Sequence, residues 1–189
     1  MVVRRVALGV VVLAACARAP VTPGSPVPEL RAIDTHGAEI DVRAAARDAN
    51  VTVIEMFSAH CPCQRVHDKR LEAMFEEYEA KGVRFFAIDA ERGASPERAK
   101  AEAAARGYRF PLLADPSGGT ARALGAEAAT HTVVLDREGR IRYSGGIDSD
   151  RVNLTDDARL YVHDAVEDLL AGREPRVTVG RTLGCALER

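Results

Sequence analysis

The chain of 189 residues has no tryptophan, only four cysteines, and no long block of charges of one sign. The lack of tryptophan means that any motif built on this residue is absent or altered. Acidic and basic residues are mixed along the sequence and leave a formal net charge of −2, so no basic stripe predicts nucleic-acid binding. Hydrophobic residues at 47% and charged residues at 29% are typical of a globular domain. Phosphate-binding loops, Ser-His-Asp patterns, transmembrane helices and internal repeats are not visible in the sequence.

The first residues are typical of an export signal. Arg4 and Arg5 precede an apolar run, residues 6–15, that is too short to span a bilayer and has the length of a signal-peptide core. The run ends in "LAAC", which resembles the bacterial lipobox, with Cys16 as the lipidated residue. We therefore expect a signal peptide over residues 1–15 and a lipoprotein of the bacterial cell envelope that faces the periplasm or the exterior. The alternative is an ordinary signal peptide with a cysteine there by chance.

A proline-rich segment follows the signal. The stretch "ARAPVTPGSPVP" carries four closely spaced prolines, which favour extended polyproline II over a packed element. We predict a stiff membrane tether over residues 16–28, one domain over 29–172, and a cysteine-containing tail over 173–189.

Cysteine usage favours redox chemistry. If Cys16 carries lipid, the remaining thiols are Cys61, Cys63 and Cys185, an odd number, in a compartment where disulfides persist. One of these thiols therefore stays free or exchanges with a partner.

Strand-like and helix-like segments alternate along the chain. A leading hairpin over 30–42 precedes buried strands at 51–57, 83–89 and 110–115, and a second hairpin spans 131–145. Helices are predicted from Pro62 to Gly82, from Ser95 to Arg106, briefly near 117–125, and over 158–172. Residues 67, 71, 74 and 78 form one stripe of the first helix. This alternation predicts an α/β fold with a central mixed sheet flanked by helices.

The stretch "FSAHCPCQRVH" carries the chemistry. Cys61 lies where a buried strand ends and a helix begins, with Pro62 at the first helical position. At this N-cap a thiolate can accept hydrogen bonds from the amides of Cys63 and Gln64 and is stabilised by the helix dipole. A protonated His60 would act in the same direction. We expect Cys61 to be a nucleophile with a lowered pKa.

Two thiols can resolve an oxidised Cys61. A Cys61–Cys63 disulfide would close a small ring, and strain makes such bonds more oxidising. Too much strain would leave Cys185 as the resolving partner. The alternative without redox chemistry is a pair of inert, buried thiols.

At this point the sequence resembles a known family. "VPEL", "FSAHCPC", "GVRFFAID", "FPLLADPSG" and "TVVLDREGRIRYSGGID" are similar to the thioredoxin-like fold, and within it to the redoxin branch, the alkyl hydroperoxide reductase/thiol-specific antioxidant superfamily. The similarity covers about residues 27–172, and "TLGCAL" resembles bacterial redoxin-domain proteins that end in a Gly-Cys element. The resemblance implies a thioredoxin-like fold and redox-active cysteines without an organic cofactor.

The chain also departs from the patterns of that superfamily. Thioredoxins carry C-x-x-C after a tryptophan and a cis-proline facing the site; the place of that proline falls on Thr130, followed by His131. We expect Thr130 and His131, with Pro62 and Ser58, to position substrate or tune the thiols. Of the two residues that precede the reactive cysteine of peroxiredoxins, Ser58 matches and Ile54 does not. A thiol peroxidase remains an alternative.

A copper site is the other alternative. Sco-type copper chaperones share the fold and combine two cysteines at this helix start with one histidine. Here Cys61, Cys63 and His131 would form a set suited to Cu(I), although the cysteine spacing differs from theirs. His67, on the helix stripe, is expected to pack or to modulate the thiols.

These observations favour a membrane-anchored thiol–disulfide oxidoreductase of the redoxin type. Cys61 would attack a disulfide or oxidised sulfur of a thiol protein or small-molecule oxidant, and Cys63 or Cys185 would resolve the product. An envelope reductant would then restore the thiols. No metal is expected unless the copper alternative holds.

Overall fold

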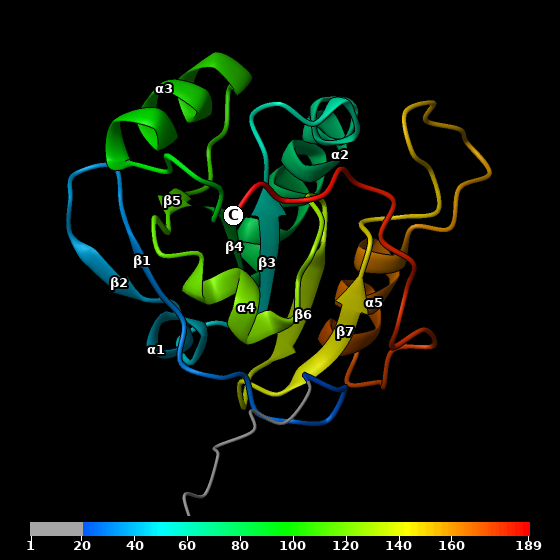
Figure 1. Cartoon of the computed structure of the whole chain (residues 1–189). Helices are drawn as coiled ribbons and strands as arrows, with labels where there is room; N and C mark the ends of the chain where they lie inside the picture. Colours follow the sequence, from blue (N-terminus) through cyan, green and yellow to red (C-terminus); the bar gives the residue numbers. More distant parts are fainter. Residues whose placement is uncertain (1–20) are drawn as a thin grey trace, which may run out of the picture.

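The structure is a computed structural model that describes residues 21–189. Its centre is a seven-stranded sheet in the order β2-β1-β5-β4-β3-β6-β7 (Figure 1). Strand β3 is parallel to β4, and β4 to β5, whereas the other neighbouring pairs are antiparallel. The predicted mixed α/β sheet is therefore confirmed. The strands are β1 (Arg31–Ile33), β2 (Glu39–Asp41), β3 (Val51–Phe57), β4 (Val83–Asp89), β5 (Leu112–Ala114), β6 (Thr132–Asp136) and β7 (Ile141–Gly145).

Helices cover both faces of this sheet. The helices are α1 (Val42–Ala46), α2 (Pro62–Tyr78, extended by the 3-10 turn η1, Glu79–Lys81), α3 (Pro96–Arg106), α4 (Gly119–Leu124) and α5 (Tyr161–Leu170). One apolar layer lies between the sheet and α2, α3 and α5, and the other lies between the sheet and α1 and α4. In Figure 1, α4 lies in front of the sheet, and α2 and α5 lie behind it. Only α1 was not expected.

The long helix α2 forms as its sequence predicts. Pro62 occupies its first position, the stripe of residues 67, 71, 74 and 78 is buried, and Gly82 follows with a φ of 80°. Only glycine adopts such a left-handed conformation without strain, so the chain turns there into β4. The start of α2 is thereby held at the carboxyl end of β3.

The last residues of the predicted tether are packed against the domain. Pro26 bridges Arg140, Val27 is 1% exposed, and the amide of Val27 donates to Gly139 at 2.9 Å. Residues 24–27 therefore pack against the β6–β7 turn instead of forming a free spacer. The predicted signal peptide and Cys16 lie outside the described residues.

The tail after α5 belongs to the folded domain, although we expected it to lie outside. Leu187 is buried in the apolar layer that also contains α4. Figure 1 shows the tail, in red, crossing the upper end of β3. Hydrogen bonding rather than helix or strand structure holds most of it.

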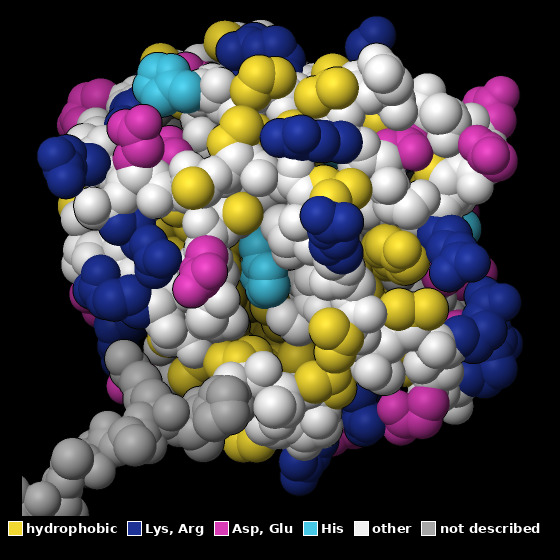
Figure 2. Space-filling model, turned by 45° about the vertical axis from the view of Figure 1, so that its right-hand side comes forward, with side chains coloured by type: hydrophobic (Ala, Val, Ile, Leu, Met, Phe, Trp, Pro, Cys, Tyr) yellow, Lys and Arg dark blue, Asp and Glu magenta, His cyan; other side chains and the backbone are white. Residues whose placement is uncertain are grey.

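Two surface features bear on partners. Among residues 21–189 no helix combines the length and the apolar character that crossing a bilayer requires. Figure 2 shows basic and acidic side chains interspersed over one face of the molecule, in agreement with the mixed charges of the sequence.

Candidate active site

Cys61 occupies the predicted position between β3 and α2. It is the N-cap of α2, with extended backbone angles (φ −80°, ψ 118°), and Pro62 is the first helical residue. Its sulfur makes no capping hydrogen bond of ordinary geometry within the helix, although the expected amides of Cys63 and Gln64 do lower its pKa. The amide of Cys185 instead donates to the Cys61 sulfur at 3.2 Å. The donor therefore comes from the far end of the chain.

Three sulfur atoms meet at this point. The Sγ atoms of Cys61, Cys63 and Cys185 all lie within 4.8 Å of one another, and all three are free thiols. The Cys63 thiol donates to the carbonyl oxygen of Leu183 at 3.4 Å. Cys61 and Cys63 are 1% and 2% exposed, whereas Cys185 is half-buried. The fold thus joins residues more than 120 positions apart into one thiol cluster.

The three thiols differ in acidity. Burial alone would raise the pKa of Cys61, but the Cys185 side chain and the amides of Gln64, Cys185 and Cys63 bring it below its ordinary value. Burial and the Cys61 sulfur raise the pKa of Cys63. The pKa of Cys185 is raised to about 12, mainly because its thiol is hydrogen-bonded to Cys61. Cys61 is therefore the sulfur that ionises first.

Of the residues expected to tune Cys61, His60 and Ser58 do not contact its sulfur by a hydrogen bond. His60 is exposed, and its amide donates to the buried Ser58 hydroxyl at 3.4 Å. His60 is also not among the main interactions that shift the pKa of Cys61. Ile54, at the second peroxiredoxin position, is a buried core residue of β3.

Thr130 and His131 lie beside the cluster on the segment that leads into β6. Thr130 is the only non-glycine residue of the described chain with a positive φ, 64°, a conformation that is costly for a β-branched side chain. Its amide donates to the carbonyl oxygen of Met56 at 2.8 Å, which extends the β3–β6 pairing. Such strain is common where a backbone segment is held for function.

His131 is occupied by hydroxyl groups rather than by the thiols. Its Nδ1 lies 3.1 Å from the Thr182 hydroxyl, and its Nε2 lies 3.1 Å from the Ser144 hydroxyl. Burial lowers its pKa to about 4, so the ring is neutral near pH 7. The soft-ligand group in the structure consists of Cys61, Cys63 and Cys185, with Cys185 in the place where we expected His131.

Sequence reasoning missed Glu55, which lies within β3. The side chain is 1% exposed, and neither carboxyl oxygen has a hydrogen-bond partner. Burial raises its pKa well above the ordinary value, with further contributions from Asp68 and Cys61. Glu55 is thus a buried carboxyl group whose raised pKa depends in part on the Cys61 sulfur. A single charged residue within an apolar strand was the available signal.

Sequence reasoning also missed a buried ion pair below the cluster. His67 Nδ1 lies 2.6 Å from the Cys63 carbonyl oxygen, and Nε2 lies 3.0 Å from an Asp148 carboxylate oxygen. Both partners are acceptors, so both ring nitrogens carry protons. Burial alone would lower the pKa of His67, but these bonds raise it. Asp148 is buried although it belongs to an acidic loop, a composition that is typical of solvated segments.

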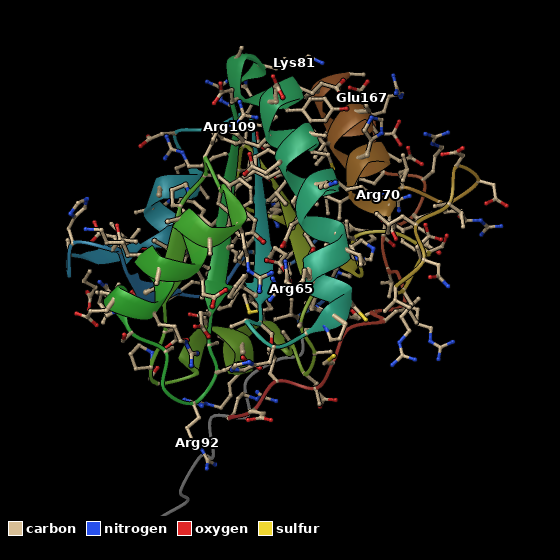
Figure 3. All side chains as sticks on the ribbon, turned by 90° about the horizontal axis from the view of Figure 1, so that it is seen from above. Arg65, Arg70, Lys81, Arg92, Arg109 and Glu167 are labelled. Atoms are coloured by element: carbon tan, nitrogen blue, oxygen red, sulfur yellow. The ribbon has the colours of Figure 1, made fainter. Side chains whose placement is uncertain are left out.

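Arg70 is a third charged residue beside the His67–Asp148 pair. It contacts Asp148 and Asp150 and donates to the Thr155 carbonyl oxygen at 2.8 Å. Figure 3 shows Arg70 on the side of α2 that faces the loop after β7, and Arg65 near the start of the helix. The first turns of α2 are thereby fixed to the loop of residues 148–160.

Comparisons with known proteins relate the chain to one family and to several solved structures. The Redoxin family matches residues 22–158. A hypothetical protein from Sinorhizobium meliloti 1021 has a TM-score of 0.81 at 26% identity, over 89% of this chain and 95% of that one. An uncharacterized conserved protein from Geobacillus kaustophilus has a TM-score of 0.81 at 27% identity, over 89% and 93% of the two chains.

A third structure has a stated activity. The thioredoxin domain of a thiol-disulfide oxidoreductase from Bacteroides vulgatus has a TM-score of 0.62 at 16% identity, over 78% of this chain and 97% of that one. At this identity the likeness shows the fold alone. No curated protein matches the chain.

Proposed function

Because the chain belongs to the Redoxin family, we propose that it is a thiol–disulfide oxidoreductase with Cys61 as nucleophile and Cys185 as resolving thiol. One observation carries this proposal. The sulfur with the lowered pKa lies within 4.8 Å of two further sulfurs, both of which have raised pKa values. A thiolate beside protonated thiols is the arrangement that disulfide exchange requires.

The first half of the reaction oxidises the cluster. The Cys61 thiolate attacks one sulfur of a substrate disulfide, the substrate S–S bond breaks, and the other substrate sulfur leaves as a thiolate. Cys185 then loses its proton and attacks the sulfur of Cys61, and the substrate sulfur that was bonded to Cys61 leaves as a thiolate. The substrate has gained two electrons, and the chain holds a Cys61–Cys185 disulfide. Since Cys61 is buried, the tail must lift before a protein disulfide reaches it.

Cys185 is favoured over Cys63 as the resolving thiol. A Cys61–Cys63 bond would close a small ring across Pro62 and distort the start of α2. A Cys61–Cys185 bond joins separate segments that are already aligned by the 3.2 Å hydrogen bond.

Peptide mapping of oxidised protein tests the proposal. The reduced chain is treated with oxidised glutathione, quenched in acid and mapped by mass spectrometry. We expect a Cys61–Cys185 disulfide, loss of all reaction in Cys61→Ser, and a glutathione adduct that accumulates on Cys61 in Cys185→Ser. Cys63→Ser is the matched control and should still form the Cys61–Cys185 bond. Full reaction in Cys61→Ser would refute the nucleophile.

The observed cluster favours a second function, binding of Cu(I) as cargo. Thiolate ligands select Cu(I), and the described residues bring three sulfurs, but no histidine or carboxylate, into the same group. Titration with Cu(I) against a chromogenic chelator should then show one tight site that weakens in Cys185→Ser and is unchanged in His131→Ala. A chain that never competes with the chelator would exclude this function.

We further propose that the protein is a lipoprotein anchored at Cys16. The "LAAC" sequence after a short apolar run supports this location. Replacement of Cys16 by serine should move the protein from the membrane fraction to the soluble fraction of envelope extracts. Equal membrane recovery of both proteins would contradict the anchor.

A further inference from the structure

The tail takes a defined route over the thiol cluster. It first pairs with β7, where the amide of Ser144 donates to Thr178 at 3.0 Å and the amide of Gly180 donates back to Ser144 at 3.1 Å. It then crosses the start of α2, and the Cys63 thiol donates to Leu183. Hydrogen bonds therefore hold it on both sides of the cluster.

Beyond the cluster the tail pairs with the segment that precedes β6. The amide of Ala129 donates to the Cys185 carbonyl oxygen at 2.8 Å, and the amide of Leu187 donates to Glu127 at 2.9 Å. Leu187 inserts its side chain into the core. Cys185 thus has its own backbone anchored within a short strand-like pairing.

Gly184 makes this close approach possible. A Cβ atom at this position would lie 1.8 Å from the carbonyl oxygen of Ala129, which is backbone and cannot move aside as a side chain can. The tail therefore lies flat on the segment only because residue 184 has no side chain. Cys185 follows directly and is held next to Cys61.

The consequence is an unequal exposure of the three cysteine residues. The tail covers Cys61 and Cys63, which are 1% and 2% exposed, while Cys185 on the tail itself is only half-buried. In a Cys61–Cys185 disulfide formed in this position, an external thiol would reach the sulfur of Cys185 more easily than the sulfur of Cys61.

We propose that Cys185 is the exchange point for the reductant: the thiol that regenerates the protein attacks Cys185, and the buried Cys61 is the leaving group. This inference rests on the proposed function and assigns its second half. The partner is a thiol compound or a protein with an accessible dithiol, and it meets the tail rather than the start of α2.

Reduction of the Cys61–Cys185 disulfide takes two thiolate attacks. A reductant thiolate attacks the sulfur of Cys185, the Cys61–Cys185 bond breaks, and Cys61 leaves as a thiolate. A second reductant thiolate attacks the first reductant sulfur and releases Cys185, which takes up a proton. The protein disulfide has gained two electrons and the reductant has become a disulfide.

The chemistry of the cluster agrees with this direction. Thiol–disulfide exchange is faster when the departing sulfur has the lower pKa. The amides around Cys61 remain in place during attack on Cys185 and stabilise the departing thiolate. Attack on Cys61 would instead expel Cys185, which has no backbone amide among the interactions that shift its pKa.

The test uses the full chain, oxidised to the Cys61–Cys185 disulfide, and reduced glutathione as the probe. The mixture is quenched in acid at early times, and the adduct is located by mass spectrometry. We expect the adduct on Cys185. An adduct mainly on Cys61 would overturn the inference while leaving the oxidoreductase intact, whereas failure to form any disulfide within the cluster would overturn both.

A tail variant provides the matched comparison. Gly184→Ala keeps all three thiols but displaces the tail from Ala129. We expect the share of adduct on Cys61 to rise about tenfold, which corresponds to about 1.4 kcal/mol and is within the range for forcing a methyl group into a packed contact. Ala186→Ser, on the exposed side of the tail, should match the wild type. No change in Gly184→Ala would show that the tail does not shield Cys61.

Discussion

Replacement of Cys185 by alanine tests whether the Cys185 thiol stabilises the thiolate form of Cys61. The Cys185 thiol makes the largest of the interactions that lower the pKa of Cys61, and the variant removes this donor while leaving the Cys185 amide, 3.2 Å from the sulfur, in place. The anchoring contacts of Ala129 and Leu187 use the backbone and the Leu187 side chain, so the tail stays docked. The variant therefore isolates one hydrogen bond.

The size of the effect follows from the burial of the site. A hydrogen bond to a charged group contributes about 1.5–3 kcal/mol, and S–H is a weak donor, so the lower end applies. With Cys61 only 1% exposed, water does not replace the lost donor. A loss of about 1.4 kcal/mol reduces the thiolate population about tenfold at a pH below its titration.

The assay is the ultraviolet absorbance of the thiolate, followed against pH. We expect the first titration step to move to higher pH in Cys185→Ala and to disappear in Cys61→Ser. Cys185→Ser supplies a hydroxyl donor at the same position and should restore the wild-type curve. If the alanine variant titrates like the wild type, or if serine does not restore the curve, the tail does not stabilise the thiolate.

Three further predictions concern the residues around the cluster. Glu55 has a raised pKa in the folded state, so its cost to stability grows as pH rises above about 4.5. Glu55→Gln should therefore have a higher melting temperature than the wild type at pH 8 but nearly the same one at pH 4.5. An equal gain at both pH values would contradict a protonated carboxyl group in the folded state. His67 also has a raised pKa in the folded state, so the stability that it contributes is complete below about pH 6.5 and is lost as pH rises through the folded pKa. In His67→Gln the denaturation midpoint should therefore depend less on pH above pH 6.5 than in the wild type. The same pH dependence in both proteins would exclude an imidazolium at this position. Arg106, 2% exposed and 2.7 Å from Asp68, should cost about 3–5 kcal/mol in urea unfolding when replaced by methionine. The exposed Arg109→Met control should cost at most about 1 kcal/mol, and similar losses in both would refute the role of burial.

The elements that frame the site could be predicted because their signals are local. The strands of residues 51–57 and 83–89 form as expected, since continuous apolar runs are typical of parallel strands buried on both faces. Pro62 and Gly82 mark the start and the end of the helical segment because each residue has a restricted or permissive backbone of its own. Cys61 at the helix start follows from these two signals.

Local signals were too weak at shorter or irregular segments. Helix α1 has five residues, fewer than a periodic pattern needs, and the last helix begins at Tyr161 instead of residue 158. Asp148 has acidic neighbours along the chain, a composition that is typical of a solvated loop. Its burial depends on His67 and Arg70, which lie about 80 positions earlier in the chain.

The amino-acid sequence by itself determined the α/β class, the position of Cys61 at a helix start, and the presence of a third thiol near the C-terminus, because propensity, capping and composition act over a few residues. Only the tertiary structure decided which groups surround the Cys61 sulfur. Backbone pairing between the tail and residues 127–129 brings Cys185, rather than His131, to the cluster, and Gly184 permits this contact by the absence of a side chain. Such pairing uses main-chain groups that every residue carries, and therefore leaves no pattern in the order of side chains.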